Sequence, residues 1–363
     1  MVKTRRTPYG SLIGEAQGAE DADISLPKLE HWSAQDTLPE IDPEYDDSNW
    51  TRCNKATTVN AQKPLSLPVL YSGDYGYHTG TKIYRGRFDG AATGANITVQ
   101  NGIAAGWAAW LNGKYVGGAV GDPPLPTTSV SLVFDDSLLN AHDNVLTIVT
   151  DSTGHDEDNV RPYGAQNPRG ILGATLLGDG GNDFSSWRIQ GNAGGEANID
   201  PIRGPMNEGG LYGERMGWHL PGYKPPHSAS RDTPLGGVSA AQGRFYITSF
   251  RLHLEKDLDV PIGLRLHAPP GTNAVVQIFM NGYHFGHYLP HLGPQNVFPF
   301  PPGVINNRGQ NALAISLWAL TDDGARLDQV ELVLYAKYRS GFGFARDWGY
   351  LQPGYDVGRE VYK

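Results

Sequence analysis

Short apolar runs, separated by Gly, Pro, Asn and Asp, recur along most of this chain. A first set lies at residues 82–88, 96–100, 108–116, 129–134 and 145–150. A second set lies at residues 245–254, 262–266, 275–280, 297–300, 312–317 and 329–338. Runs of this length bounded by turn-forming residues are typical of β-strands. Because no segment between them keeps a 3.6-residue apolar period for three turns, the pattern predicts an all-β protein.

The two sets of predicted strands resemble each other. Residues 110–117 (WLNGKYVG) match residues 279–286 (FMNGYHFG), and residues 144–148 (NVLTI) match residues 311–315 (NALAI). Each Asn-Gly pair lies between apolar residues and predicts a type I′ hairpin turn, since both central residues of that turn need positive φ. We therefore expect two tandem jelly-roll β-sandwiches, each a copy of the other.

Composition along the chain suggests domain limits. The first 23 residues are polar and predict a flexible tail, and we expect residues 24–178 to form the first sandwich and residues 244–345 the second. Residues 179–243 are rich in Gly, Pro and charged residues and match neither set of strands. A stretch of about 65 residues is too long for an ordinary loop. It predicts an ordered segment packed between the sandwiches, with residues 346–363 as a C-terminal extension.

Overall composition and charge exclude several classes of protein. With 39% hydrophobic and 18% charged residues, the 363-residue chain is expected to fold. A net charge of -9 supplies no basic field for a nucleic-acid backbone. No run of about 18 apolar residues could span a membrane, and the N-terminus lacks the apolar core of a signal peptide. The single cysteine, Cys53, excludes an internal disulfide.

Paired carboxylates in the Gly-rich segment raise the possibility of a glycosidase, because glycoside hydrolysis commonly uses one carboxylic acid and one carboxylate. Arginines lie within a few residues of them, and Arg–Glu pairs beside glycines typically hold an irregular backbone in place. We interpret these residues as a structural motif and expect no catalytic residue among them. The motif comprises Glu196, Arg203, Asn207, Glu208, Glu214 and Arg215.

The histidines and glycines predict no metal or cofactor site. His284, His287 and His291 could supply imidazoles, but the first two flank a hairpin and Pro290 breaks any helix that would align the three. The sequence also contains no P-loop, no Gly-x-Ser-x-Gly elbow and no strand-linked Gly-x-Gly-x-x-Gly motif. We therefore expect no nucleotide cofactor and no bound metal.

Two loops contain residues that could contact a sugar. Tyr77 and His78 could stack on a sugar ring, although aromatic residues beside a strand are also common in sheet packing. The acidic loop 151–163 offers Asn159, Arg161 and Tyr163, and loops on a rigid β-scaffold often carry recognition. The alternative for this loop is a solvated turn.

Two short motifs have the form of N-glycosylation sites. Asn49-Trp-Thr51 and Asn96-Ile-Thr98 both match the Asn-x-Ser/Thr sequon. Because motifs this short occur often by chance, we treat Asn49 and Asn96 as candidates.

Longer motifs resemble a known family. They are Trp32, residues 38–40 (LPE), 45–50 (YDDSNW), 75–80 (YGYHTG), 84–88 (YRGRF), 110–112 (WLN), 167–171 (NPRGI), 191–192 (GN), 194–196 (GGE), 203–205 (RGP), 207–212 (NEGGLY), 214–215 (ER), 293–295 (GPQ) and Leu317-Trp318. Together they resemble the two C-terminal jelly-roll domains of large fungal β-galactosidases of glycoside hydrolase family 35. The resemblance covers about residues 24–340.

This resemblance implies an accessory part of a secreted enzyme. Family members carry both catalytic glutamates and the main galactose-binding residues in an N-terminal (β/α)8 barrel, and a repeat pattern of that size is absent from this chain. The family's counterpart of residues 155–163 approaches the barrel's cleft and often carries a Trp. Asn159 and Tyr163 are the candidates here. Without a signal peptide in the sequence, a cytoplasmic location stays open.

Three functional hypotheses follow. The chain could be a non-catalytic part that braces a catalytic barrel, present as a domain or a separate chain, and this predicts a large exposed apolar patch. It could be a free-standing module that binds a β-galactoside or a polysaccharide. It could also be an enzyme with a new pocket between the sandwiches, which requires convergent polar groups in a concave site.

Overall fold

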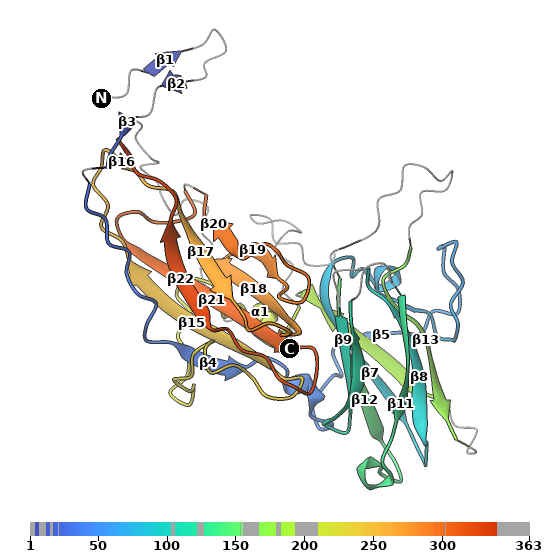
Figure 1. The fold of residues 1–363 in the computed structure, drawn as a ribbon. Coiled ribbons are helices and arrows are strands. Elements are labelled where there is room, and N and C mark those ends of the chain that lie inside the picture. The colour runs from blue at the N-terminus through green and yellow to red at the C-terminus, as the bar shows by residue number, and fades with distance from the viewer. Residues whose placement is uncertain are drawn as a thin grey trace.

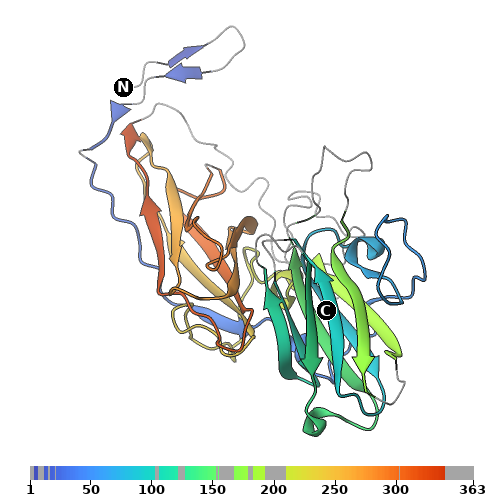
Figure 2. The same cartoon turned by 45° about the vertical axis from the view of Figure 1, so that its right-hand side comes forward.

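The computed structural model describes residues 4–6, 12–14, 17–20, 22–102, 106–121, 127–152, 154, 167–178, 183–192, 210–301 and 303–339. Across these residues the protein consists of antiparallel β-strands, with a single-turn helix α1 (Tyr212–Arg215) and three 3-10 turns, η1 (Pro39–Ile41), η2 (Ser72–Tyr75) and η3 (Asp136–Leu138). Figure 1 shows two sandwiches, with α1 drawn against the left-hand one, and they remain side by side in the turned view of Figure 2. The all-β prediction with two tandem sandwiches is confirmed.

The first sandwich pairs a six-stranded sheet with a four-stranded sheet. In spatial order, the larger sheet contains β10 (Lys114–Val120), β9 (Gly106–Leu111), β12 (Asn144–Ser152), β7 (Gly80–Phe88), β14 (Ser186–Gly191) and β5 (Thr51–Arg52). The smaller sheet contains β11 (Thr127–Val133), β8 (Gly94–Gln100), β13 (Gly170–Leu177) and β6 (Leu70–Tyr71). Their facing side chains, including Tyr84, Trp107 and Trp187, form one buried core.

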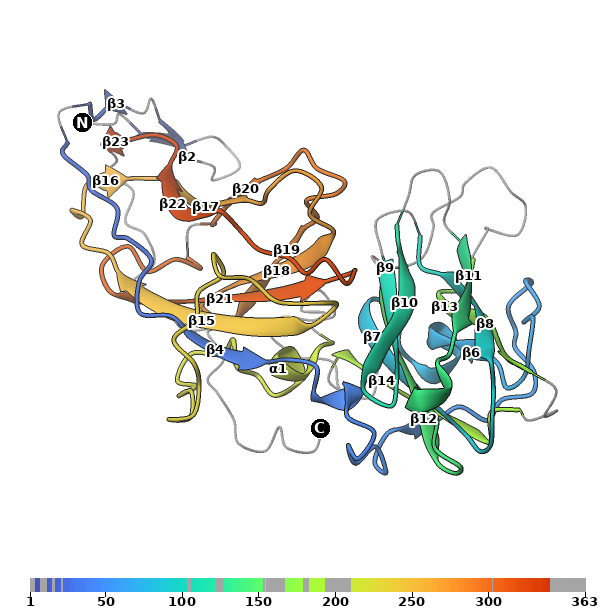
Figure 3. The same cartoon turned by 60° about the horizontal axis from the view of Figure 1, so that its bottom comes forward.

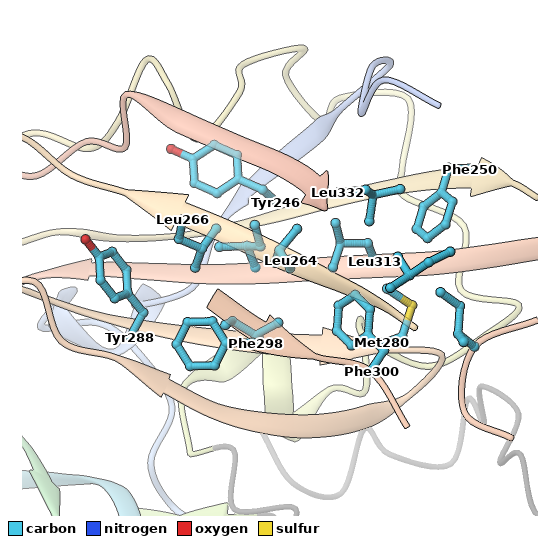
Figure 4. Packing of buried hydrophobic residues seen from close by; sticks show 14 of the residues in the cluster. Tyr246, Phe250, Leu264, Leu266, Met280, Tyr288, Phe298, Phe300, Leu313 and Leu332 are labelled. Atoms are coloured by element: carbon cyan, nitrogen blue, oxygen red, sulfur yellow. The ribbon is translucent and has the colours of Figure 1, made fainter. Parts of the chain in front are cut away.

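The second sandwich pairs a five-stranded sheet with a three-stranded sheet. The larger sheet contains β19 (Tyr283–Tyr288), β18 (Ala274–Met280), β21 (Gln310–Ala319), β15 (Gly243–Arg251) and β4 (Ser33–Asp36). The smaller one contains β20 (Val297–Pro299), β17 (Ile262–His267) and β22 (Gln329–Leu334). Figure 4 shows the core between them, where Tyr246, Met280 and Leu313 of the larger sheet face Leu264 and Phe298.

Two small sheets complete the described strands. Strand β23 (Tyr338–Arg339) lies between β16 (Leu258–Asp259) and β3 (Gln17–Gly18), and β1 (Thr4–Arg6) pairs with β2 (Leu12–Gly14). Next to β3, Ala19 is completely buried and its backbone N–H donates to the carbonyl of Lys337. The N-terminal segment, predicted to be a flexible tail up to residue 23, is therefore paired with the second sandwich around residues 17–19.

The same asparagine network occurs once in each sandwich. Asn112 and Asn281 occupy the predicted hairpin turns with φ of 47° and 50°. Asn112 Nδ2 donates to Asn144 Oδ1 at 2.8 Å, and Asn281 Nδ2 donates to Asn311 Oδ1 at 2.8 Å. In addition, Asn112 Oδ1 accepts from the backbone N–H of Val145, and Asn281 Oδ1 accepts from that of Ala312, each at 2.8 Å. The repeated asparagines therefore fasten each hairpin to its neighbouring strand.

The structure corrects the predicted limits of the first sandwich at both ends. Strand β4 pairs with β15, and Trp32 and Ala34 belong to the core of the second sandwich. Residues before about 37, assigned to the first sandwich by the sequence, thus belong to the second. In the opposite sense, β14 lies within the predicted linker 179–243 but pairs with β7 of the first sandwich. A short strand carries too little pattern to show which sheet it joins.

The outer faces of the two large sheets are apolar and meet across the junction. All seven residues of β18 and all nine of β12 are buried, as expected for strands covered on both faces. Ile83, Trp110 and Val149 of the first sandwich share a buried cluster with Val275 and Trp318 of the second. Leu38, Trp50 and Leu211 fill the space between them. The junction is therefore a third hydrophobic core.

Candidate functional site

A buried ion pair lies inside this junction. The Arg215 guanidinium of α1 donates through Nη2 to the Glu40 carboxylate of η1, and both side chains are completely buried. Nη1 donates to the carbonyl of Gly210 at 2.7 Å. The guanidinium carbon lies 5.8 Å from the ring centre of Trp50 and 5.7 Å from that of Tyr212. Because a buried charge needs both a counter-ion and hydrogen bonds, this arrangement fixes how α1 and η1 pack.

Close contacts hold α1 against the second sandwich, and Figure 3 shows it beside β4 and beneath β15. The backbone N–H groups of Tyr212 and Gly213 donate to the carbonyl and the hydroxyl of Thr37, at 3.1 and 2.8 Å. A Cβ on Gly213 would lie 2.7 Å from ring atoms of both Phe245 and Trp218. Any side chain at this position would therefore push the helix off the second sandwich.

The same segment touches the first sandwich at Gly210. A Cβ added there would lie 1.9 Å from the carbonyl oxygen of Thr81 in β7. This is far closer than atoms can approach, so the position requires glycine. The Gly-rich composition between residues 204 and 213 thus has a steric cause at two described positions.

Glu214 is a buried carboxyl beside this ion pair. Its side chain is 2% exposed and lies beside the Ser316 hydroxyl and the Arg215 guanidinium. Burial raises the pKa of Glu214 to about 7, which outweighs the lowering of the pKa by the Ser316 hydroxyl and by the positive charge of Arg215. A carboxyl with such a pKa could act as a general acid in an open site. In this structure the carboxyl is enclosed at the junction.

A second buried cation fastens the segment that leads to Trp50. Arg85 Nε of β7 donates to Asp47 Oδ2 at 2.7 Å. Its other N–H groups donate to the carbonyls of Glu40, Asp42 and Pro43. The segment carrying Glu40 therefore wraps around a β7 side chain while its carboxylate reaches Arg215.

Polar side chains also link the sandwiches directly. Gln277 Nε2 of β18 donates to Thr81 Oγ1 of β7 at 3.4 Å, and that hydroxyl donates to Asp151 Oδ1 at 3.0 Å. Beside them, Lys82 Nζ donates to Ser152 Oγ at 2.6 Å. All five side chains are buried. Directional bonds of this kind specify the relative orientation of the sheets more narrowly than apolar contact alone.

The predicted sugar-contact residues are not brought together by the described structure. Tyr77 is 2% exposed and packs in the core of the first sandwich, where its hydroxyl donates to Gln190 Oε1 at 3.2 Å. Its ring is therefore unavailable to a ligand, which corrects that expectation in favour of sheet packing. The adjacent His78 is half-buried.

Several other predicted residues lie outside the described part of the chain. They are Asn159, Arg161 and Tyr163 of the acidic loop and Glu196, Arg203, Asn207 and Glu208 of the structural motif. Of that motif, the structure therefore places Glu214 and Arg215 only. The counter-ion of Arg215 is Glu40, which the sequence analysis did not include among its site residues.

Among the described residues, His284, His287 and His291 do not form a metal-ligand set. The rings of His284 and His287 lie with their centres 5.1 Å apart, and burial lowers the pKa of His291. The described residues contain no group of three or more His, Cys, Asp or Glu side chains arranged to hold a metal ion. Likewise, no described helix is long and apolar enough to cross a membrane.

The sequon asparagines and the cysteine have contrasting environments. Asn49 and Asn96 are both exposed, and Asn96 Oδ1 accepts from Ser131 Oγ at 2.7 Å. Exposure keeps both asparagines as glycosylation candidates. Cys53 is buried, and that burial raises the pKa of its thiol well above the usual range.

The fold and its junction define a protein built from two copies of one β-sandwich domain. Comparison with known families agrees, since the model of the β-galactosidase second all-β domain matches residues 45–156 and again residues 212–323. One match falls in each sandwich. The chain belongs to the β-galactosidase family and corresponds to the C-terminal part of its fungal members.

Curated fungal relatives match along nearly the whole chain. Probable β-galactosidase C of Aspergillus fumigatus is 74% identical over 355 residues, which cover 98% of this chain and 36% of that protein. The protein of the same name from Talaromyces marneffei is 58% identical and is covered to 37%. The chain therefore spans about a third of the length of these relatives. A solved lectin from Pleurotus ostreatus matches at 14% identity with a TM-score of 0.23, too low to support any inference.

The sequence alone did not reveal the two buried ion pairs, Arg215–Glu40 and Arg85–Asp47, because the residues of each pair lie far apart along the chain. Glu40 is 175 residues away from Arg215, and Arg85 and Asp47 belong to separate motifs. Glu40, Arg85 and Asp47 do lie within the segments 38–40, 84–88 and 45–50, which carry the family resemblance. Nothing in the spacing of these motifs reveals which charged residues pair.

Proposed function

We propose that this chain is the non-catalytic C-terminal part of a glycoside hydrolase family 35 β-galactosidase and that it braces the catalytic barrel. The observation that carries this proposal is the third hydrophobic core, with the enclosed Arg215–Glu40 pair, which joins the sandwiches into one body. A rigid body of this kind suits a bracing role, because it can present two sandwich surfaces at a fixed separation. The relatives' names supply the substrate class, terminal β-galactosides.

The two carboxyl groups next to Arg215 support a non-catalytic role for the junction. Glycosidic cleavage needs two carboxyl groups that both reach the scissile bond. Glu214 and Glu40 are both enclosed in the junction, and Glu40 is neutralised by Arg215. Substrate could reach neither of them without separating the sandwiches.

An exposed apolar segment on the first sandwich offers a surface for the barrel. Val59 is fully exposed, and Leu65 and Leu67 are 68% and 64% exposed. These three large apolar side chains lie within nine residues, and a contiguous exposed apolar patch is typical of an interaction surface. We propose that the barrel, or a chain carrying it, covers this segment. The loop with Asn159, Arg161 and Tyr163 remains our candidate for a contact near the barrel's cleft, and secretion remains part of the proposal.

A chimera tests the bracing role. The A. fumigatus relative would carry this chain in place of its matched region, and the thermal inactivation of its hydrolysis of a chromogenic β-galactoside would be followed. We expect Leu65→Ser with Leu67→Ser to inactivate at lower temperature, with unchanged turnover at 25 °C. Ser131→Ala, on an exposed strand away from this segment, is the control. Unaltered inactivation in the double variant would argue against docking there, and loss of turnover without loss of stability would argue for a catalytic contribution.

A further inference from the structure

A concave pocket of about 560 Å³ lies on the outer face of the second sandwich. Its floor is formed by Ile247 and Ser249 of β15 and by Ala312 and Ala314 of β21. The residues after α1, from 218 to 225, form its wall. Of the two β21 floor residues, Ala312 is partly exposed, whereas Ala314 is 2% exposed and belongs to the cluster against which Trp218 and Ile247 pack. The volume falls within the usual range of small-molecule sites, roughly 300–1,000 Å³.

Trp218 stands in the wall and is fixed by three aromatic rings. It packs edge-on against Tyr212 and Phe245, with ring centres 5.5 and 5.8 Å apart, and it stacks on Tyr223 at 6.0 Å. Tyr223 is itself held by hydrogen bonds between its hydroxyl and the Gln35 amide at 3.0 and 3.2 Å. The Trp218 ring stays partly exposed. A partly exposed ring already locked in place loses little conformational freedom when a ligand stacks on it.

The polar groups at the rim are neutral. Gln310 and Ser249 are exposed, and neither side chain makes a hydrogen bond to another described residue. Asn306 adds a third neutral side chain. The described lining contains no Asp, Glu, Lys or Arg, and its only titratable groups besides Tyr223 are His31 and His219. A ligand with a net charge would find no counter-ion here.

We propose that this pocket binds a neutral pyranose sugar, as a mono- or disaccharide. The apolar face of a pyranose matches an aromatic wall, and its hydroxyls match amide and hydroxyl groups that are not already engaged. Trp218 provides the wall, and Gln310 and Ser249 provide the polar contacts. This inference is independent of the bracing role, because the pocket is described entirely by residues of the second sandwich and the segment after α1.

The test uses the full 363-residue chain. Titration calorimetry with lactose and with methyl β-D-galactopyranoside and methyl β-D-glucopyranoside would measure binding directly. Ser249→Trp fills the pocket from an exposed strand position, and Ser131→Trp makes the same change on β11 of the first sandwich. We expect Ser249→Trp to weaken binding of the sugar that binds by at least about tenfold, while Ser131→Trp leaves it unchanged.

A second, milder substitution distinguishes the loss of a ligand contact from misfolding of the protein. Gln310→Ala removes one rim contact at an exposed position, and we expect a several-fold loss of affinity with an unchanged melting temperature. Gln295→Ala, also exposed but away from the pocket, is its control. The proposal is overturned if none of the three sugars binds at concentrations up to about 0.1 M, or if binding survives Ser249→Trp in a folded protein. Tighter binding of glucuronic acid than of the neutral sugars would also overturn it.

Discussion

Replacing Glu214 by Gln should make the protein more stable at neutral pH and change how its stability depends on pH. The carboxyl is fully enclosed at the junction, and burial raises its pKa from 4.5 to about 7. Gln has nearly the same shape and carries no charge at any pH. The substitution therefore removes the cost of ionisation and leaves the packing unchanged.

The sign and size follow from proton linkage. Below about pH 4.5 the carboxyl is protonated in both the folded and the unfolded chain, and it imposes no penalty. Between about pH 4.5 and 7 the unfolded chain releases the proton while the folded protein retains it, so the free energy of unfolding falls as pH rises. A pKa difference of about 2.5 corresponds to roughly 3 kcal/mol, reached above pH 7.

Urea unfolding followed from pH 4.5 to 8 measures this effect. The difference in unfolding free energy between Glu214→Gln and the native chain should rise across this range and then level off. Taking the difference cancels other groups, including His291, whose lowered pKa acts in the opposite direction. Glu44→Gln, at an exposed position, is the matched control and should show no such rise.

Two results would refute the reasoning. A difference that stays flat with pH would mean that Glu214 keeps an ordinary pKa, and hence that water or another group solvates it. A Gln variant that is less stable at every pH would mean that the ionised carboxylate stabilises the junction through Arg215.

The remaining predictions concern the junction and the repeated asparagines. Arg215→Met leaves the Glu40 carboxylate buried without a counter-ion and should cost about 3–5 kcal/mol in urea unfolding, most of it recovered when Glu40→Gln is added. Asn281→Ala removes three hydrogen bonds and should cost about 2–3 kcal/mol by the same assay, whereas a cost near zero would deny the network a structural role. Gly210→Ala should lower the melting temperature strongly and Gly236→Ala little, because the added Cβ would lie 1.9 Å from a backbone oxygen at Gly210 but 3.4 Å from one at Gly236; equal effects would contradict the close approach.

The architecture could be predicted because its signals are local. The Asn-Gly turns at Asn112 and Asn281 determine their own backbone geometry, and the two copies support each other, so each half could be recognised as a sandwich. The strands around them have strong apolar patterns. Such features depend on neighbours in sequence, which a single chain displays directly.

The junction could not be predicted because its contacts are long-range. Strand β4 has four residues of mixed polarity, and its pairing with β15 joins segments about 210 residues apart. The Arg215–Glu40 pair spans 175 residues. The continuous apolar runs of β12 and β18 indicate strands that are covered on both faces. They do not reveal that the two sandwiches cover each other at these strands.

The pocket beside Trp218 could not be predicted from the sequence for a related reason. The residues Trp218 to Pro221 lie in the Gly- and Pro-rich segment 179–243. Their role depends on where that segment meets the alanines of β21, about 95 residues later. Side chains as small as Ala312 and Ala314 leave no recognisable motif in a sequence.

Hydrolysis of a chromogenic β-galactoside by the purified 363-residue chain tests the central claim most directly. We predict no hydrolysis above the buffer rate, with the same result for Glu214→Gln, because the described carboxylates of the junction are enclosed and the chain acts as a brace. Hydrolysis that persists through repurification and disappears in Glu214→Gln would contradict this account and would make the junction an active site.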